Sequence, residues 1–169
     1  MVGFPHSQIN GARPAAPQRI TPVRVVLDTN VVLSIVVFHD ARFDPLVRAW
    51  RSREVVPLVD RHCVDELARV LDYPQFAHRY GGREAALAEY LPYTETVDTE
   101  GRGAGLARCR DPDDQKFIVL ADVGRAAALV TSDAMLLGVR RRVRFAVETP
   151  KAFLARLDRH AAIGHPSAS

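Results

Sequence analysis

Cysteine, lysine and long apolar runs are scarce in this chain of 169 residues, and each shortage excludes a class of protein. Cys63 and Cys109 are the only cysteines, and neither lies in a CxxC motif or a Cys/His cluster, which argues against a disulfide framework and a zinc site. The best apolar run, Val31 to Phe38, is far shorter than the roughly 20 residues that cross a bilayer, so we expect a soluble protein. The start of the chain shows no secretory signal pattern, and the expected compartment is the cytosol.

Few of the positively charged residues of the chain are lysines. Lys116 and Lys151 are the only lysines among 23 basic residues, so arginine supplies the rest. With 20 acidic residues the net charge is +3, and the isoelectric point is near 9.2. A mild positive excess assists an encounter with a polyanion, and a guanidinium group is a good phosphate ligand, but this balance alone barely favours nucleic acid.

Composition divides the chain into three parts. Residues 1–22 contain four prolines and two glycines without apolar periodicity, which predicts a flexible N-terminal extension. Residues 23–160 alternate short β-branched runs with helical patterns, which is typical of a parallel sheet covered by helices. We therefore expect a single α/β domain, three-layer α/β/α with a mostly parallel central sheet, followed by a C-terminal tail at 161–169.

Hydrophobic periodicity places the individual elements of this domain. Strands are predicted at 23–28, 54–60, 128–133 and 142–150, with a weak short strand inside 94–110. Helices are predicted at 30–38, 43–53, 61–71, 81–93, 111–127 and 150–160. Pro57 favours a sheet edge or an irregular register for the second strand, and Pro74 is expected to close the helix at 61–71.

Acidic residues recur where buried strands end. Asp28 ends "VVLD" and Asp133 ends "LVTSD", while Asp111, Asp113 and Asp114 open the helix at 111–127. Ligands bind outside the carboxyl ends of parallel strands, so these carboxylates are expected to face one crevice. Helix capping alone explains any one of them. Several carboxylates at one sheet edge repel each other unless a positive group lies between them, and oxygen-rich clusters suit Mg²⁺ or Mn²⁺.

The helix at 61–71 offers one further acid for this crevice. Glu66 lies beside, but not on, the apolar face formed by Val64, Leu67 and Leu71. Asp65 is an equally acidic neighbour, and a lone helical carboxylate is more often a solvated surface group. Spacing alone does not choose between the two.

Four segments together resemble a known family. The segments "VVLDTNVVLS", "CVDELARVL", "CRDPDDQKFIVLA" and "LVTSD" look like the four acidic motifs of PIN-domain nucleases, in the same order and at roughly the same intervals. The likeness is closest to the VapC-like toxin components of bacterial toxin–antitoxin pairs, and it extends from about Val23 to Arg159. Each motif is weak alone, but four in order over a βαβ pattern are strong.

The resemblance implies a metal-dependent endoribonuclease, a hydrolase that cleaves RNA phosphodiester bonds with one or two Mg²⁺ or Mn²⁺ ions. Matched motif by motif, the catalytic and metal-binding acids are Asp28, Glu66, Asp114 and Asp133. The match thereby chooses Glu66 over Asp65. Supporting roles fall to Asn30, Thr131 and Asp111, and Lys116 is expected to screen substrate phosphates. The implied partners are an RNA substrate, a cognate antitoxin and a second copy of the chain, with no membrane association.

Some positions depart from the family pattern. Gln115 stands where the family often has Asn, Ser132 replaces a glycine, and Met135 replaces an accessory acid. These changes keep open a catalytically weakened PIN-like module that binds protein or RNA. An α/β phosphatase fits less well, because it needs a second aspartate where this chain has Asn30.

Overall fold

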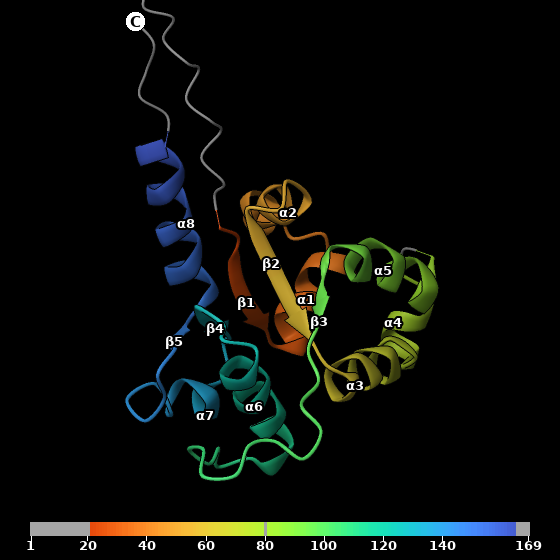
Figure 1. Ribbon diagram of the computed structural model, residues 1–169. Helices are drawn as coiled ribbons and strands as arrows, with labels where there is room; N and C mark the ends of the chain where they lie inside the picture. Colours follow the sequence, from red (N-terminus) through yellow and green to blue (C-terminus); the bar gives the residue numbers. More distant parts are fainter. Residues whose placement is uncertain (1–20, 80, 165–169) are drawn as a thin grey trace, which may run out of the picture.

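The computed structural model describes residues 21–79 and 81–164, and a parallel β-sheet forms its centre (Figure 1). The strand order is β3-β2-β1-β4-β5, and every neighbouring pair is parallel. The strands are β1 (Val23–Leu27), β2 (Val55–Val59), β3 (Glu95–Thr96), β4 (Ala128–Val130) and β5 (Ala146–Glu148). The expected α/β class and mostly parallel sheet are confirmed, and in the described residues the sheet is wholly parallel.

Helices cover both faces of this sheet. The helices are α1 (Thr29–Val36), α2 (Asp44–Arg51), α3 (Arg61–Leu71), α4 (Pro74–Ala77), α5 (Gly82–Tyr90), α6 (Gln115–Val123), α7 (Ala134–Leu137) and α8 (Pro150–Gly164). Single 3-10 turns lie at η1 (Ala41–Phe43), η2 (Leu91–Tyr93) and η3 (Pro112–Asp114). In Figure 1, α3, α4 and α5 gather beyond the β3 side, while α8 runs along the opposite side of the sheet.

The alternation of side chains along the strands builds two cores. Val25 and Leu27 of β1 join a cluster that includes apolar residues of α1, α2, α3, α5 and α8. Val26 points to the other face and joins a cluster built mainly from α6, with α7 and its flanking residues. Both faces of a parallel strand are buried in such a fold, which explains the nearly continuous apolarity of "VRVVL". The three-layer α/β/α arrangement follows from these two clusters.

Three strand ends are followed by an aspartate that caps a helix. Asp28 accepts from the backbone N–H of Val31 at the start of α1, and Asp60 accepts from Cys63 at the start of α3. Asp133 does the same at the start of α7. Because all these strands are parallel, the three carboxylates belong to one edge of the sheet. Capping therefore accounts for part of the acid pattern in the sequence, as one interpretation predicted.

One of the two proline expectations is wrong. Pro57 does not mark a sheet edge: it lies in β2, an inner strand, which tolerates the proline because β3 pairs with β2 only at Leu58 and Val59. The helix before Pro74 ends at Leu71 as expected, and Pro74 then opens α4, since proline fits the first turn of a helix, where its missing N–H is not needed. The short helix α7 was not predicted from the sequence, whereas the predicted helix at 43–53 corresponds to α2, which η1 precedes.

The expected domain boundaries meet the described residues only in part. Residues 1–20 of the expected extension lie outside them, and Thr21 and Pro22 are exposed and without regular structure. Helix α8 continues to Gly164, past the expected end at residue 160, and 165–169 again lie outside the description. Within the described ranges, no helix combines the length and apolarity needed to span a bilayer. Cys63 and Cys109 are buried free thiols, as expected.

Candidate functional site

Asp28 is the most buried of the candidate acids. It follows β1, and only 4% of its surface is exposed. Its Oδ1 accepts from the backbone N–H of Val31 at 2.8 Å, and its Oδ2 accepts from the hydroxyl of Thr131. Burial raises the pKa of Asp28 above its ordinary value, while these hydrogen bonds oppose that rise and the charge of Asp133 adds to it.

Thr131 connects two of the predicted acids. This fully buried residue follows β4, and its hydroxyl donates to Asp28 and accepts from the backbone N–H of Asp133 at 2.9 Å. Asp133 in turn accepts from the N–H groups of Met135 and Leu136 through Oδ1. The supporting position predicted for Thr131 therefore has a defined geometry, which fixes the backbone of the fourth motif relative to the first.

Asp114 lies at the end of η3, where the third motif enters α6. Its pKa is raised to about 6. Partial burial is the largest cause, followed by the negative charges of Asp133, Asp111 and Asp28, with Lys116 acting in the opposite direction. The charge of Asp133 thus contributes to the raised pKa of both Asp28 and Asp114, which agrees with the expectation that these carboxylates face one crevice.

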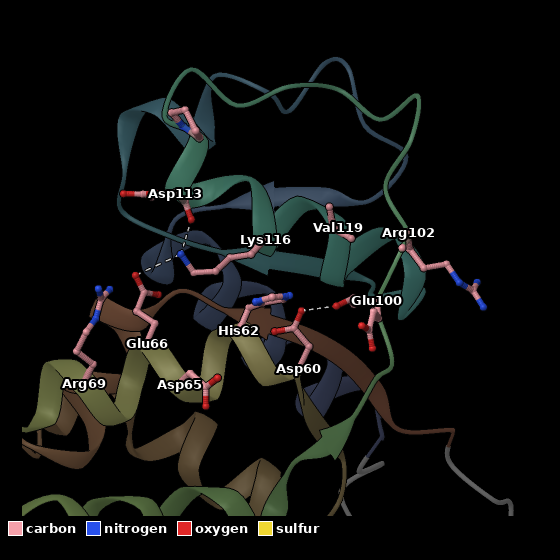
Figure 2. A pocket seen from close by; sticks show the side chains of 13 residues that line it. Asp60, His62, Asp65, Glu66, Arg69, Glu100, Arg102, Asp113, Lys116 and Val119 are labelled. Carbon is pink, nitrogen blue, oxygen red and sulfur yellow. Dashed lines mark hydrogen bonds and ion pairs between the residues drawn. The ribbon is translucent and has the colours of Figure 1, made fainter.

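Glu66 is held by groups from two other elements. The hydroxyl of Thr29 in α1 donates to Glu66 Oε2 at 2.7 Å, and the ammonium of Lys116 in α6 lies 3.2 Å from Glu66 Oε1 (Figure 2). Lys116 also donates to the backbone carbonyl of Asp113. Asp65, by contrast, is an exposed group that pairs with Arg61 at 3.7 Å. The Thr29 contact joins Glu66 to the residue next to Asp28.

The remaining predicted residues take less central positions. Asn30 is exposed in the first turn of α1, where its carbonyl accepts from Ser34. Asp111 caps η3 by accepting from the backbone N–H of Asp113 at 2.9 Å. Lys116, predicted as a substrate ligand, has only 16% of its side chain exposed and is engaged with Glu66. The phosphate-binding role of Lys116 stays a prediction.

The four acids do not converge on a single point. Among the described residues, no three His, Cys, Asp or Glu side chains form a group ready to hold a metal ion. The geometry explains this, because the oxygens of Asp28 and Asp133 accept internal hydrogen bonds and Glu66 is held toward Lys116. The donor set nevertheless fits a hard divalent cation, since it consists of carboxylate oxygens, and the repulsion among them adds to the effect of burial in raising the pKa of Asp114.

Sequence reasoning assigned no role to two residues around these acids, Thr29 and Asp60. Thr29 was not singled out, although its hydroxyl holds Glu66. Asp60 ends "VVPLVD" just as Asp28 ends its own strand, and this parallel in the sequence was a usable signal. Only 2% of Asp60 is exposed, and its Oδ2 accepts from Thr99 at 2.7 Å. Asp60 therefore fixes the start of α3, on which Glu66 lies, to the chain after β3.

Gln115, a departure from the family pattern, has a structural role. Its Oε1 accepts from the backbone N–H of Cys109 at 2.7 Å, and its Nε2 donates to the carbonyl of Ala107 at 3.1 Å. The side chain therefore pins the loop that precedes the third motif. Ser132, a second departure, is exposed between Thr131 and Asp133.

Two cavities flank the acids. The first, the α3–α6 cavity, has a volume of about 690 Å³ and lies between α3, α6 and the chain after β3 (Figure 2). Its charged lining residues are Asp60, Asp65, Glu66, Arg69, Glu100, Arg102, Asp113 and Lys116. The second, the α1–α8 groove, has a volume of about 790 Å³. It is lined by Asn30, Val31, Ser34, Arg42, Phe43, Ser132, Thr149, Pro150, Lys151, Leu154, Ala155 and Asp158.

Comparisons with known proteins agree with this geometry. A family model described as PIN domain matches residues 24–135. Among solved structures, VapBC2 from Rickettsia felis bound to a DNA fragment from their promoter is similar, with 15% identity, a TM-score of 0.53, and coverage of 75% of this chain and 98% of the other. PAE2754 from Pyrobaculum aerophilum is also similar, with 15% identity, a TM-score of 0.51, and coverage of 82% and 98%. No curated protein sequence matches this chain.

Proposed function

Because this chain belongs to the PIN-domain family, we propose that it is a metal-dependent endoribonuclease that hydrolyses phosphodiester bonds in RNA. The observation that supports this most is that Asp28 and Asp133 follow parallel neighbouring strands at one edge of the sheet and act electrostatically on Asp114, where their charges add to the rise in pKa that partial burial produces. A carboxylate that only caps a helix does not need other carboxylates nearby. Several carboxylates at one place cost folding stability unless a cation neutralises their charge. We assign the catalytic role to these three acids and to Glu66.

The same four carboxylates would hold one or two Mg²⁺ or Mn²⁺ ions. All are hard oxygen donors, which these cations prefer. A divalent cation bound there supplies positive charge for the phosphate and acidifies water near neutral pH. Such a cation would favour the charged form of Asp114 and so lower its raised pKa.

The chain's own residues orient these acids. Thr131 holds the carboxylate of Asp28 while it fixes the backbone of Asp133. Thr29 and Lys116 hold Glu66 from two sides. Mutation of the hydrogen-bond partners of metal ligands typically costs about 10–100-fold in metal affinity or activity, so Thr131 and Thr29 are part of the proposed machinery.

Cleavage of a mixed RNA panel tests this proposal directly. The wild-type protein should cleave in the presence of Mn²⁺, whereas Asp28→Asn and Asp114→Asn proteins should not. Calorimetry with Mn²⁺ alone provides a second reading that does not depend on the choice of RNA. Absence of both cleavage and Mn²⁺ binding in the wild-type protein would leave the weakened interaction module as the better description. The phosphatase alternative is not supported, because the chain matches the PIN-domain model.

Within this activity, we propose that the protein is the toxin of a type II toxin–antitoxin pair. The likeness of its four motifs to VapC-like proteins and its structural similarity to VapBC2 from Rickettsia felis support this role. Expression should then arrest growth, and a small partner encoded nearby should suppress the arrest. Equal growth with wild-type and Asp114→Asn proteins would contradict the toxin role without touching the nuclease proposal. Cytoplasmic action and a homodimer belong to the same proposal and stay predictions.

A further inference from the structure

We propose that the α1–α8 groove binds the nucleotide next to the scissile phosphate of a single-stranded RNA. This inference rests on the proposed nuclease function and adds the path that the substrate takes. The groove begins beside the candidate acids, because Asn30 follows Asp28 by two residues and Ser132 directly precedes Asp133. A strand whose phosphate lies at those carboxylates therefore reaches the groove with its neighbouring nucleotide.

The lining of the groove combines polar and apolar groups, as a nucleotide does. Asn30, Ser132 and Thr149 offer polar side chains to a sugar and phosphate, and all three are exposed. Phe43 and Leu154 also line the groove and belong to the apolar core, which suits the face of a base. The volume of about 790 Å³ is in the range of small-molecule sites, so the groove has room for a nucleotide.

Lys151 provides the strongest single argument that the groove binds an anionic ligand. It lies in the first turn of α8, where the helix dipole disfavours a cation, and no acid accompanies it there. Its side chain is exposed and makes no ion pair or hydrogen bond to any of the described residues. A lysine that costs the helix some stability and has no internal partner is explained by an anionic ligand in the groove that it lines.

Electrostatics also favours the α1–α8 groove over the α3–α6 cavity as the path of a polyanion. The α3–α6 cavity is lined by five carboxylates but only three arginine and lysine side chains, and one of these, Lys116, is already paired with Glu66. The α1–α8 groove carries Arg42 and Lys151 against the single acid Asp158; Arg42 is paired with Asp40 outside the lining, whereas Lys151 has no ion-pair partner among the described residues. A chain of phosphates is repelled by the first lining and attracted by the second.

The test measures binding of a short labelled single-stranded RNA by fluorescence anisotropy. The Asp28→Asn protein is used for binding, so that the RNA is not cleaved, and the Asp28-intact enzyme is used for kinetics. Lys151→Glu should weaken binding about tenfold and flatten its salt dependence by about one charge, and it should raise KM with little change in kcat. Ala155→Trp, which fills the groove from an exposed position on α8, should weaken binding by a similar factor.

Matched controls separate the groove from general charge and folding effects. Arg102→Glu makes the same charge change at the α3–α6 cavity, and Ala152→Trp adds the same bulk at an exposed α8 position that does not line the groove. Both controls should change RNA affinity less than about threefold. Lys151→Glu is not expected to unfold α8, because a carboxylate is favourable in the first turn of a helix. Thermal unfolding of each variant verifies this.

The outcomes distinguish this inference from the proposed function. If the wild-type protein cleaves RNA and neither Lys151→Glu nor Ala155→Trp changes KM, the nuclease proposal stands and the groove does not bind RNA. A protein partner would then be the better candidate for the groove. An equal effect of Arg102→Glu and Lys151→Glu would also overturn it. RNA binding that is lost in both groove variants, in a protein that does not cleave with Mn²⁺, would support the groove and contradict the nuclease.

Discussion

The buried hydroxyl of Thr131 donates a hydrogen bond to the carboxylate of Asp28 and so joins the ends of two neighbouring strands. The two residues are far apart in the sequence, but β1 and β4 are parallel neighbours that end at the same edge of the sheet. The same hydroxyl accepts from the backbone N–H of Asp133. One small side chain thereby sets the relative position of two candidate catalytic acids.

Thr131→Val removes this donor and acceptor while keeping the shape of the side chain. The variant should lose about 1–3 kcal/mol of stability, because it leaves buried polar groups of Asp28 and Asp133 without a partner. It should also raise the pKa of Asp28 further, since the lost bond favours the charged carboxylate. A raised carboxyl pKa costs stability once pH exceeds the unfolded value, so the loss should grow with pH. Urea unfolding across pH measures it, with Thr131→Ser as the control.

Asp28→Asn separates a helix cap from a catalytic acid. Asparagine caps helices as well as aspartate does, so the bond to Val31 persists. Its amide nitrogen cannot accept from Thr131, but removing a buried charge offsets part of that loss, so stability should fall by no more than about 2 kcal/mol. RNA cleavage should fall by about 100-fold or more, because an amide removes the negative charge that the proposed cation needs. Thermal unfolding and cleavage assays of one preparation compare the two effects. Loss of activity in proportion to loss of folded protein would indicate that Asp28 is only a cap.

Asp114→Asn should stabilise the metal-free protein above neutral pH. The folded pKa of about 6 exceeds the ordinary aspartate value, so the folded state binds more protons than the unfolded state between about pH 4 and pH 6, and stability falls as pH rises through that window. Asparagine removes this loss of folding stability. Because Asp114 is partly exposed and solvent screens its charge, we expect a gain of about 1 kcal/mol.

Chemical unfolding of the metal-free proteins at about pH 4 and about pH 8 checks the sign. The two proteins should be similar in acid, and the Asp114→Asn protein should be the more stable one in base. Added Mn²⁺ should reverse the order at the higher pH by stabilising the wild-type protein alone. If the difference in unfolding free energy between the wild-type and Asp114→Asn proteins is the same at both pH values, the pKa of Asp114 is not raised in the folded state.

Much of this fold could be predicted from the sequence, because most helices and strands have a local sequence pattern that indicates them. Helix α3 begins and ends at Arg61 and Leu71 as predicted, since Asp60 caps it and its apolar face has clear periodicity. The error at Pro57 has a nonlocal cause, because the length of β3 decides whether an inner strand tolerates proline, and nothing near Pro57 encodes that length. The short helix α7 has only one capped turn and no periodicity from which to predict it.

The position of Asp28 and Asp133 in the fold was predictable from the sequence, but the contacts that hold the candidate acids were not. Asp28 and Asp133 end buried strands, and this pattern alone placed them at one edge of the sheet. The bond from Thr29 to Glu66 joins α1 to α3, and no spacing within either segment reveals it. The residue type of Lys116 likewise gave no sign that its ammonium contacts Glu66. Contacts between helices depend on packing angles that a single sequence does not show.

Lys116→Met tests which of two roles this lysine has. Its ammonium pairs with Glu66 and opposes the raised pKa of Asp114, so it already supplies positive charge next to the proposed cation site. Removing it should free Glu66 and relieve the repulsion of a second cation, and Mn²⁺ should bind about three- to tenfold more tightly. Calorimetry with Mn²⁺ and the KM for RNA, measured on the same variant, are the two readings.

Lys116→Arg serves as the control, because it keeps the charge but changes the geometry of the donor. Its Mn²⁺ affinity should stay close to that of the wild-type protein. If Lys116→Met instead leaves Mn²⁺ binding unchanged and raises KM for RNA, the lysine contacts substrate phosphates, as its residue type alone predicted. A lysine that is 16% exposed and held by Glu66 and the carbonyl of Asp113 must break both contacts before it reaches a phosphate. We therefore expect the change in metal affinity to be the larger of the two effects.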